Sequence, residues 1–156
     1  MGTTMTIRAM IGDDVARVAE IEQAHQPRPW SEGVFRDELA ADNRRYLVAG
    51  DDEIVGFGGV MVIGDEAHVT NLLVAETHRG AGIGRALMVE LIAQARSMGA
   101  RHLTLEVRKR NHPARSLYSA LGLAPVGVRP GYYGDDDALI LWAHDIDRPD
   151  FMDSLR

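Results

Sequence analysis

Apolar residues follow two different spacings along the chain, and the spacing changes from one segment to the next. Segments in which apolar and polar residues alternate, and short continuous apolar runs, predict β-strands. Such segments occupy residues 6–10, 46–49, 54–62, 67–74, 102–108, 126–132 and 138–142. Turn-forming stretches such as GDDE (50–53) and IGDE (63–66) separate them. The pattern therefore predicts seven strands.

Four stretches with apolar residues about 3.6 positions apart predict helices. Asp13 or Asp14 can cap the first helix, which ends before the two prolines of HQPRPW (25–30). Ser31 is the expected cap of the second. Gly99 and Gly122 are expected to end the third and fourth. The residues at helical spacing are Val15, Val18, Ala19 and Glu22; Val34, Phe35 and Leu39; Ile83, Leu87, Leu91 and Ala95; and Ala114, Leu117, Tyr118 and Leu121.

The elements alternate in the order β-α-α-β-β-β-α-β-α-β-β. This order predicts the α/β (α+β) class, with a mixed sheet covered by helices on both faces and one β-α-β unit over residues 67–108. No repeat or linker interrupts the chain. We therefore expect a single domain over residues 1–147 and a loosely held tail at 148–156.

Composition narrows the class of protein. A chain of 156 residues with 46% apolar and 26% charged residues is typical of one globular domain. It contains no run of eighteen apolar residues, and the first ten residues contain no apolar core of signal-peptide length. The sequence thus predicts a cytoplasmic protein without a membrane partner.

Several kinds of chemistry are excluded or disfavoured. The chain has no cysteine, so disulfides and thiolate nucleophiles are excluded, and its six histidines show no metal-binding spacing. We therefore expect no metal. A formal net charge of −6 argues against direct nucleic-acid binding.

Positive charge is concentrated in residues 79–115. This segment contains eight Lys or Arg residues and two Glu residues, so its net charge is +6. Such a segment on an acidic protein indicates an anionic ligand. Each single arginine can equally belong to a solvated helix face.

A glycine cluster in THRGAGIGRALM (77–88) lies where a strand should end and a helix begin. A helix N-terminus offers unpaired N–H groups, and glycines let a phosphate approach the main chain, so Gly80, Gly82 and Gly84 predict a diphosphate cradle. The spacing fits neither the dinucleotide fingerprint nor the NTP-binding loop. It is R-x-x-G-x-G, followed by Arg85.

RGAGIG after the strand VTNLLVA (69–75) resembles the acetyl-CoA-binding signature of the Gcn5-related N-acetyltransferases (GNAT), and the element order matches that family over nearly the whole chain. Five further segments are similar to its ribosomal-protein-alanine N-acetyltransferase, or RimI-like, branch. They are PWSEGVF (29–35), LEVRKRN (105–111), SLYSALGL (116–123), RPGYY (129–133) and DALIL (137–141). The resemblance implies a seven-stranded, mixed, mostly antiparallel sheet with about four helices on its faces and splayed central strands.

The resemblance also implies a role for individual residues. Glu106 would be the proton acceptor and Tyr118 the proton donor. Asn111 would contact the pantetheine arm of acetyl-CoA, and the main chain of residues 72–74 would pair with that arm as another strand would. Residues implied to bind acetyl-CoA are Leu72, Leu73, Val74, Arg79, Gly80, Ala81, Gly82, Ile83, Gly84, Arg85 and Asn111; those near the acceptor entrance are Trp30, Tyr132 and Tyr133.

Proton chemistry agrees with these roles. Amide formation from a thioester needs a neutral amine and a proton for the departing thiolate. At pH 7 roughly a tenth of a free α-amine is neutral, against about one molecule in two thousand of a lysine amine. The gap of about 2.5 pKa units corresponds to roughly 3.4 kcal/mol, so a modest base such as Glu106 suits an α-amine better.

Other interpretations of the same residues stay open. Tyr118 lies on an apolar stripe and can be a packed aromatic, Glu106 can be a solvent-facing carboxylate, and Trp30, Tyr132 and Tyr133 can line the entrance or cover the core. Several relatives carry a longer turn after the tyrosine pair. In this chain only residues 134–136 separate YY (132–133) from DALIL (137–141). Asp135, Asp136 and Asp137 either favour a basic peptide or form a solvated turn.

The function expected is transfer of an acetyl group from acetyl-CoA to the N-terminal α-amine of a protein, with the N-terminal alanine of a ribosomal protein as the acceptor that the resemblance implies. Alternatives are acetylation of lysine side chains or of a small-molecule amine, and a non-catalytic module that binds acetyl-CoA. Retention of both Glu106 and Tyr118 argues against the last. We expect a monomer or weak dimer.

Overall fold

The computed structural model describes residues 5–155. Residues 1–4, which contributed to the expectation about secretion, lie outside the described residues. The strands are β1 (Ile7–Ala9), β2 (Arg44–Ala49), β3 (Gly56–Ile63), β4 (Glu66–Val74), β5 (His102–Arg108), β6 (Ala124–Arg129) and β7 (Ala138–His144). The α-helices are α1 (Val15–His25), α2 (Glu32–Ala40), α3 (Ile83–Ser97) and α4 (His112–Ala120). The predicted element order is confirmed.

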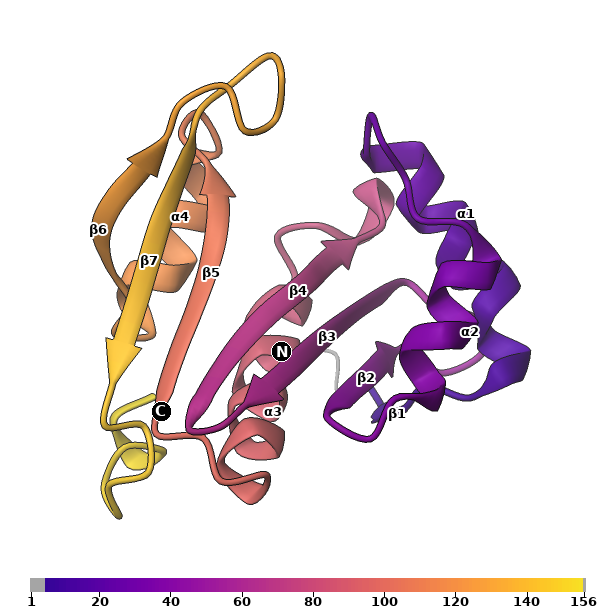
Figure 1. Ribbon diagram of the computed structural model, residues 1–156. Helices are drawn as coiled ribbons and strands as arrows, with labels where there is room; N and C mark the ends of the chain where they lie inside the picture. Colours follow the sequence, from indigo (N-terminus) through magenta and orange to yellow (C-terminus); the bar gives the residue numbers. More distant parts are fainter. Residues whose placement is uncertain (1–4, 156) are drawn as a thin grey trace.

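The seven strands form one sheet in the order β1-β2-β3-β4-β5-β7-β6. Only β4 and β5 pair in parallel, and all other neighbours are antiparallel. Figure 1 shows α1 and α2 on one face of the β2–β4 half of the sheet, α3 behind that half and α4 behind β5 and β7. The mixed sheet with helices on both faces is therefore confirmed.

Local signals explain most helix boundaries. The Ser31 hydroxyl accepts a hydrogen bond from the Val34 N–H at 3.2 Å, which confirms the predicted cap of α2. Asp14 directly precedes α1, but its carboxylate accepts from the Ile11 N–H and from Arg8 and makes no cap bond to the helix. The expected capping of α1 by this side chain is thus wrong.

Two apolar clusters hold the sheet between its helices. One lies under α1 and α2 and contains Val18, Phe35 and Phe57. The larger cluster contains the whole apolar stripe of α3 together with the inward side chains of β5 and β7. Because Leu103, Leu105 and Val107 are buried in this larger cluster, the alternation of β5 directs Thr104 and Glu106 to the opposite face of the sheet.

β4 and β5 pair only at their starts. Their ladder contains three residue pairs, ending at His68 and Thr104, and the strands then diverge (Figure 1). A β-bulge at Thr70 shifts the register of β4 against β3 by one residue, and bulges bend a strand away from its neighbour. The splayed central strands implied by the resemblance are therefore present, and they leave the β5-facing edge of residues 69–74 without a strand partner.

Two predictions near the C-terminus need correction. β6 ends at Arg129, so Tyr132, predicted as the last residue of this strand, lies with Tyr133 in the β6–β7 loop. The tail after residue 147 is packed: Phe151 and Leu155 are 3% and 4% exposed and belong to the larger apolar cluster. The error arose because the few apolar residues of this segment are spaced among charged ones, so their burial is not visible in the local pattern.

Candidate active site

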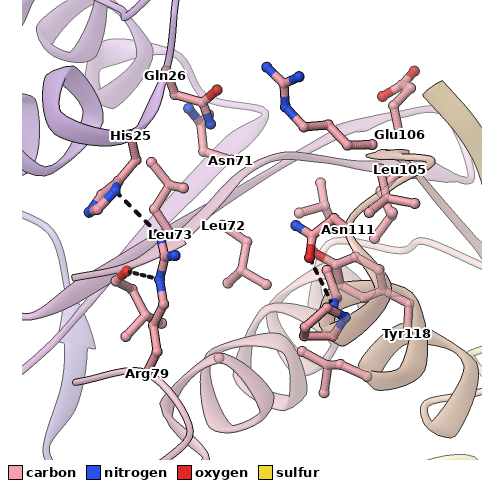
Figure 2. A pocket seen from close by; sticks show the side chains of 18 of the residues that line it. His25, Gln26, Asn71, Leu72, Leu73, Arg79, Leu105, Glu106, Asn111 and Tyr118 are labelled. Atoms are coloured by element: carbon pink, nitrogen blue, oxygen red, sulfur yellow. Dashed lines mark hydrogen bonds between the residues drawn. The ribbon is translucent and has the colours of Figure 1, made fainter. Parts of the chain in front are cut away.

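A cleft of about 1030 Å³ occupies the space where β4 and β5 diverge. It is lined by the end of β4, the loop before α3, the start of α4, the end of β5, the α1–α2 loop and the tyrosine pair of the β6–β7 loop. Figure 2 shows the side chains of Glu106, Asn111 and Tyr118 on one side of this cleft and those of His25 and Arg79 on the other. The topology thus brings together residues that lie far apart in the sequence.

The cleft wall formed by β4 offers free main-chain groups. Leu72, Leu73 and Val74 pair with β3 along one edge, while their other edge faces the cleft. A strand edge without a partner can bind an extended chain through its N–H and C=O groups. These residues are therefore placed as the resemblance implies for a pantetheine arm.

The glycine loop is shaped as an open cradle. Gly80 and Gly82 have φ angles of +83° and +82°, and a Cβ placed on either would meet no atom within 4 Å. Gly82 is the N-cap of α3 and provides no side-chain cap, so the first N–H groups of the helix point to free space. A helix N-terminus of this kind binds phosphate groups.

Two arginines flank the cradle, and each already has a partner. Arg79 donates to the Val74 carbonyl at 3.2 Å and lies 3.3 Å from His25 Nδ1 (Figure 2). Arg85 donates to the carbonyl of Leu155, so its guanidinium anchors the C-terminal segment. Among the predicted cofactor-binding residues, all line the cleft except Ala81, which is exposed in the loop.

Asn111 lies at the start of α4 and caps it. Its side-chain oxygen accepts a hydrogen bond from the Ala114 N–H at 3.2 Å (Figure 2). The capping bond uses the oxygen and leaves the amide N–H groups free to donate. Because Asn111 also lines the cleft, these groups are available to a carbonyl of a bound ligand.

Glu106 lies at the point where β4 and β5 separate. One carboxylate oxygen is 2.6 Å from His68 Nε2, and the other is 3.9 Å from the Arg129 guanidinium. The hydrogen bond from His68 lowers the pKa of Glu106, opposed by burial and helped by the positive charge of Arg129. Glu106 is therefore a negatively charged carboxylate in a half-enclosed position.

His68 was not among the residues predicted for the site. It lies on the same sheet face as Glu106, because His68 pairs with Thr104 and Glu106 follows two positions later on β5. The period-2 alternation of β4 could have placed His68 on a face, but only the parallel register places it beside Glu106.

Tyr118 combines packing with exposure to the cleft. Its ring is 7% exposed and belongs to the larger apolar cluster, yet the residue lines the cleft. Burial raises the pKa of Tyr118, helped by nearby Tyr133, so the hydroxyl keeps its proton. Within residues 5–155, no hydrogen bond to this hydroxyl is found, so the proton is available to a ligand.

Three aromatic residues from the α1–α2 and β6–β7 loops line the cleft. Trp30 packs on Phe35 with ring centroids 5.4 Å apart, and Tyr132 meets Tyr133 edge-on at 5.0 Å. Tyr132 is 47% exposed, and all three predicted entrance residues line the cleft. Burial raises the pKa of Tyr133 to about 12, with smaller contributions from Tyr132 and Glu106.

The three aspartates of the short turn are used within the protein. Asp135 pairs with Arg108, Asp136 accepts from the Arg110 N–H at 2.9 Å, and Asp137 accepts from the Gly131 N–H at 2.8 Å. Arg108 in turn lies over the Tyr133 ring at 4.4 Å. The three aspartates are therefore neither a simply solvated turn nor a free acidic patch for a basic peptide. Their contacts fix the loop that carries Tyr132 and Tyr133.

Comparison with known proteins identifies the family. A model of the acetyltransferase (GNAT) family matches residues 15–123, which is more than half of the chain. The chain belongs to this family. The GNAT resemblance inferred from RGAGIG and the element order is thereby confirmed.

Individual relatives agree with this GNAT assignment. A Bacillus subtilis (strain 168) relative is 36% identical over 146 residues, covering 91% of this chain and 97% of the relative. The Escherichia coli (strain K12) ribosomal protein bS18-alanine N-acetyltransferase is 31% identical over 140 residues, covering 87% of this chain and 95% of that protein.

Solved GNAT structures have the same fold. The crystal structure of the ribosomal-protein-S18-alanine N-acetyltransferase from Escherichia coli has a TM-score of 0.82 at 30% identity and covers 91% of this chain and 94% of the other. Arabidopsis thaliana NAA60 in complex with acetyl-CoA has a TM-score of 0.82 at 21% identity, covering 90% and 98%. The first of these supports the RimI-like branch, and the second shows the fold alone.

No helix within residues 5–155 is long and apolar enough to span a membrane. In the same part of the chain, no group of three or more His, Asp or Glu side chains is arranged to hold a metal ion.

Proposed function

We propose that this GNAT protein transfers the acetyl group of acetyl-CoA to the N-terminal α-amine of a protein, and that the acceptor is a ribosomal protein with an N-terminal alanine. One observation carries the proposal: a charged carboxylate, Glu106, lies at the fork of β4 and β5 in a cleft that also contains Tyr118. The names of the relatives support the acceptor class, since those proteins are bS18-alanine N-acetyltransferases.

The cleft fits acetyl-CoA as the donor substrate. The free edge of β4 suits the pantetheine arm, and the open cradle at Gly80 and Gly82 suits the pyrophosphate, because a Cβ at either glycine would occupy the space the phosphates need. Asn111 has free amide N–H groups for the arm. Acetyl-CoA supplies the thioester that is to be attacked.

Glu106 accepts the first proton, the one that the amine loses, and His68 supports Glu106. The carboxylate attracts the acceptor ammonium and accepts, directly or through water, the proton that the amine loses as the N–C bond forms. His68 stabilises the charged carboxylate through the 2.6 Å contact. Because that contact lowers the pKa of Glu106, the residue is a weak base, and its pKa mismatch with a lysine amine near 10.4 is larger than its mismatch with an α-amine near 8.

Tyr118 donates the second proton, the one that the departing sulfur needs. As the C–S bond breaks, the hydroxyl donates its proton to the departing sulfur. Burial raises the pKa of Tyr118, which weakens it as an acid, but burial of the thiolate in the same cleft raises the basicity of the sulfur as well.

Thiol release from acetyl-CoA with two peptides of one basic sequence tests the proposal. One peptide has a free N-terminal alanine and no lysine, and the other is blocked at its N-terminus and has one internal lysine. We expect rapid release with the first alone. Glu106→Gln provides the control for uncatalysed release.

The other outcomes favour the alternatives. Equal release with both peptides would indicate a cleft that also accepts lysine side chains. Release with free amines such as polyamines, undiminished by competing peptide, would indicate a small-molecule substrate. Acetyl-CoA binding without turnover of any amine would indicate a binding module. The cytoplasmic location and the monomer or weak dimer remain predictions from the sequence.

A further inference from the structure

Glu22 is a buried carboxylate that the acetyl-transfer chemistry does not use. It lies on α1, is 2% exposed and borders the acceptor side of the cleft. Burying a carboxylate is costly unless its oxygens are hydrogen-bonded. Glu22 is one of two charged residues in the described chain with so little exposure, and the other, Asp14, is paired with Arg8.

One oxygen of Glu22 holds the α1–α2 loop. Oε2 accepts a hydrogen bond from the main-chain N–H of Trp30 at 2.9 Å, across eight residues of sequence. The loop that leads to Trp30 contains two prolines and no helix or strand, so no regular main-chain hydrogen bonds fix its course. The bond therefore sets where Trp30 enters the cleft wall.

The second oxygen faces β4. Oε1 of Glu22 and Oδ1 of Asn71 are both buried and have no hydrogen-bond partner among the described residues. The Asn71 amide is nevertheless close enough to Glu22 to lower the pKa that burial raises. Two orientations of the amide are possible: Nδ2 donates to a carboxylate, or Oδ1 accepts from a protonated Glu22. The first orientation gives Glu22 Oε1 a donor and leaves Asn71 Oδ1 without one, whereas the second gives both oxygens a partner.

We propose that Glu22 is a positioning residue for the acceptor, which clamps the Trp30 loop to Asn71 on β4 and so fixes the width of the acceptor entrance. Asn71 directly precedes Leu72, the first residue of the strand edge assigned to the donor substrate. Glu22 thus links the wall that meets the acceptor to the strand that meets the donor. The inference rests on the proposed function for its kinetic effect, although the clamp itself does not.

Replacing Glu22 by Met removes the hydrogen bond to Trp30 and the carboxylate oxygen beside Asn71 while keeping a long side chain. We expect the KM of Glu22→Met for the alanine peptide to rise about tenfold while the KM for acetyl-CoA changes less than about twofold. Glu22→Gln keeps an acceptor for Trp30 and a partner for Asn71, so it should restore the native acceptor KM. Val18→Ala, another buried change in α1, is the control for lost stability alone.

A second measurement needs no activity. In a Trp142→Phe background Trp30 is the only indole, and acrylamide quenching of its fluorescence reports the loop position. We expect stronger quenching in Glu22→Met than in the Glu22→Gln and Val18→Ala proteins. If no peptide is acetylated by the native protein, the proposed function fails while quenching still tests the clamp. If Trp30 of the Glu22→Met protein were quenched as in the native protein, and its KM for the alanine peptide were also native, the positioning role of Glu22 would be overturned.

Discussion

Glu106 shows how a single residue depends on its surroundings. Its own strand gives it a face of the sheet, but its pKa is set by His68 on the neighbouring strand and, more weakly, by Arg129 at the end of β6. The same contacts that keep Glu106 charged limit its strength as a base. This combination suits an amine that already loses its proton near neutral pH.

Glu106→Gln should lower kcat by about 10²- to 10⁴-fold, the range expected for loss of one positioned proton acceptor. It should also remove a pH-dependent part of stability. Because the pKa of Glu106 is lowered in the folded protein, the stabilisation is present above the unfolded pKa of about 4.3 and is lost as pH falls through the folded value.

Urea unfolding of native and Glu106→Gln proteins between pH 3 and pH 7 measures this effect. The difference in unfolding free energy should be largest at pH 7 and should shrink below about pH 4.3. Glu90→Gln, an exposed position on α3, is the matched control. A difference that is constant over the whole range would contradict the lowered pKa.

Tyr118→Phe separates catalysis from packing. The ring remains in the apolar cluster and only a hydroxyl without a partner in residues 5–155 is removed, so the melting temperature should change little. If the hydroxyl donates the second proton, kcat should fall by about 10²-fold or more. Steady-state kinetics beside a thermal melt check both; a native kcat would leave Tyr118 a packing residue.

At the scale of elements, the loop before α3 and the end of β4 act together. The loop takes two left-handed turns at glycines, and β4 loses its partner after a three-residue ladder. Both features cost backbone stability that packing elsewhere must offset. The result is an accessible helix N-terminus beside an accessible strand edge, which is what a long ligand with an anionic end requires.

Gly82→Ala tests the cradle. A Cβ at a left-handed position costs about 1–2 kcal/mol, and here it would also enter the space proposed for phosphates. We expect the KM for acetyl-CoA to rise at least about tenfold, because each lost hydrogen bond to a charged group is worth about 1.5–3 kcal/mol.

Gly64→Ala is the matched control for this change. Gly64 lies in the β3–β4 turn with φ of +61° and likewise has no atom within 4 Å of its Cβ position, so the backbone strain is similar. The KM of the Gly64→Ala protein for acetyl-CoA, measured by thiol release, should equal that of the native protein. Equal kinetic effects of the two substitutions would show that strain alone, and not the cradle, explains the loss.

At the scale of the whole molecule, the C-terminal segment completes the fold. Phe151 and Leu155 close the larger apolar cluster, and the Leu155 carbonyl holds Arg85 beside the cradle. The segment thus connects the end of the chain to the first turn of α3, beside the cradle.

Phe151→Ala should therefore lower the unfolding free energy by about 3–5 kcal/mol, as expected when a buried phenylalanine leaves a cavity. Asp150→Ala removes a side chain that is 81% exposed and should change it by less than about 0.5 kcal/mol. Chemical denaturation measures both. Similar stability of the two variants would restore the view of a loosely held tail.

The sequence by itself determined the features that depend on neighbours along the chain. Apolar spacing gave the order of all eleven main elements, Ser31 marked the start of α2, and RGAGIG marked the helix start that forms the cradle. These signals are local because a helix or strand buries one face, and because caps and left-handed turns involve only a few consecutive residues. Glu106 and Tyr118 could be selected from the motifs that surround them.

Only the tertiary structure decided the features that depend on which strands lie side by side. The parallel register of β4 and β5 places His68 against Glu106, and the divergence of the same strands opens the cleft. Burial of Glu22 beneath Trp30, and of Phe151 in a polar segment, follows from contacts across many residues. Such contacts join residues that are far apart in the sequence and that only the fold brings together. They therefore produce no repeating pattern of apolar and polar residues from which they could be predicted.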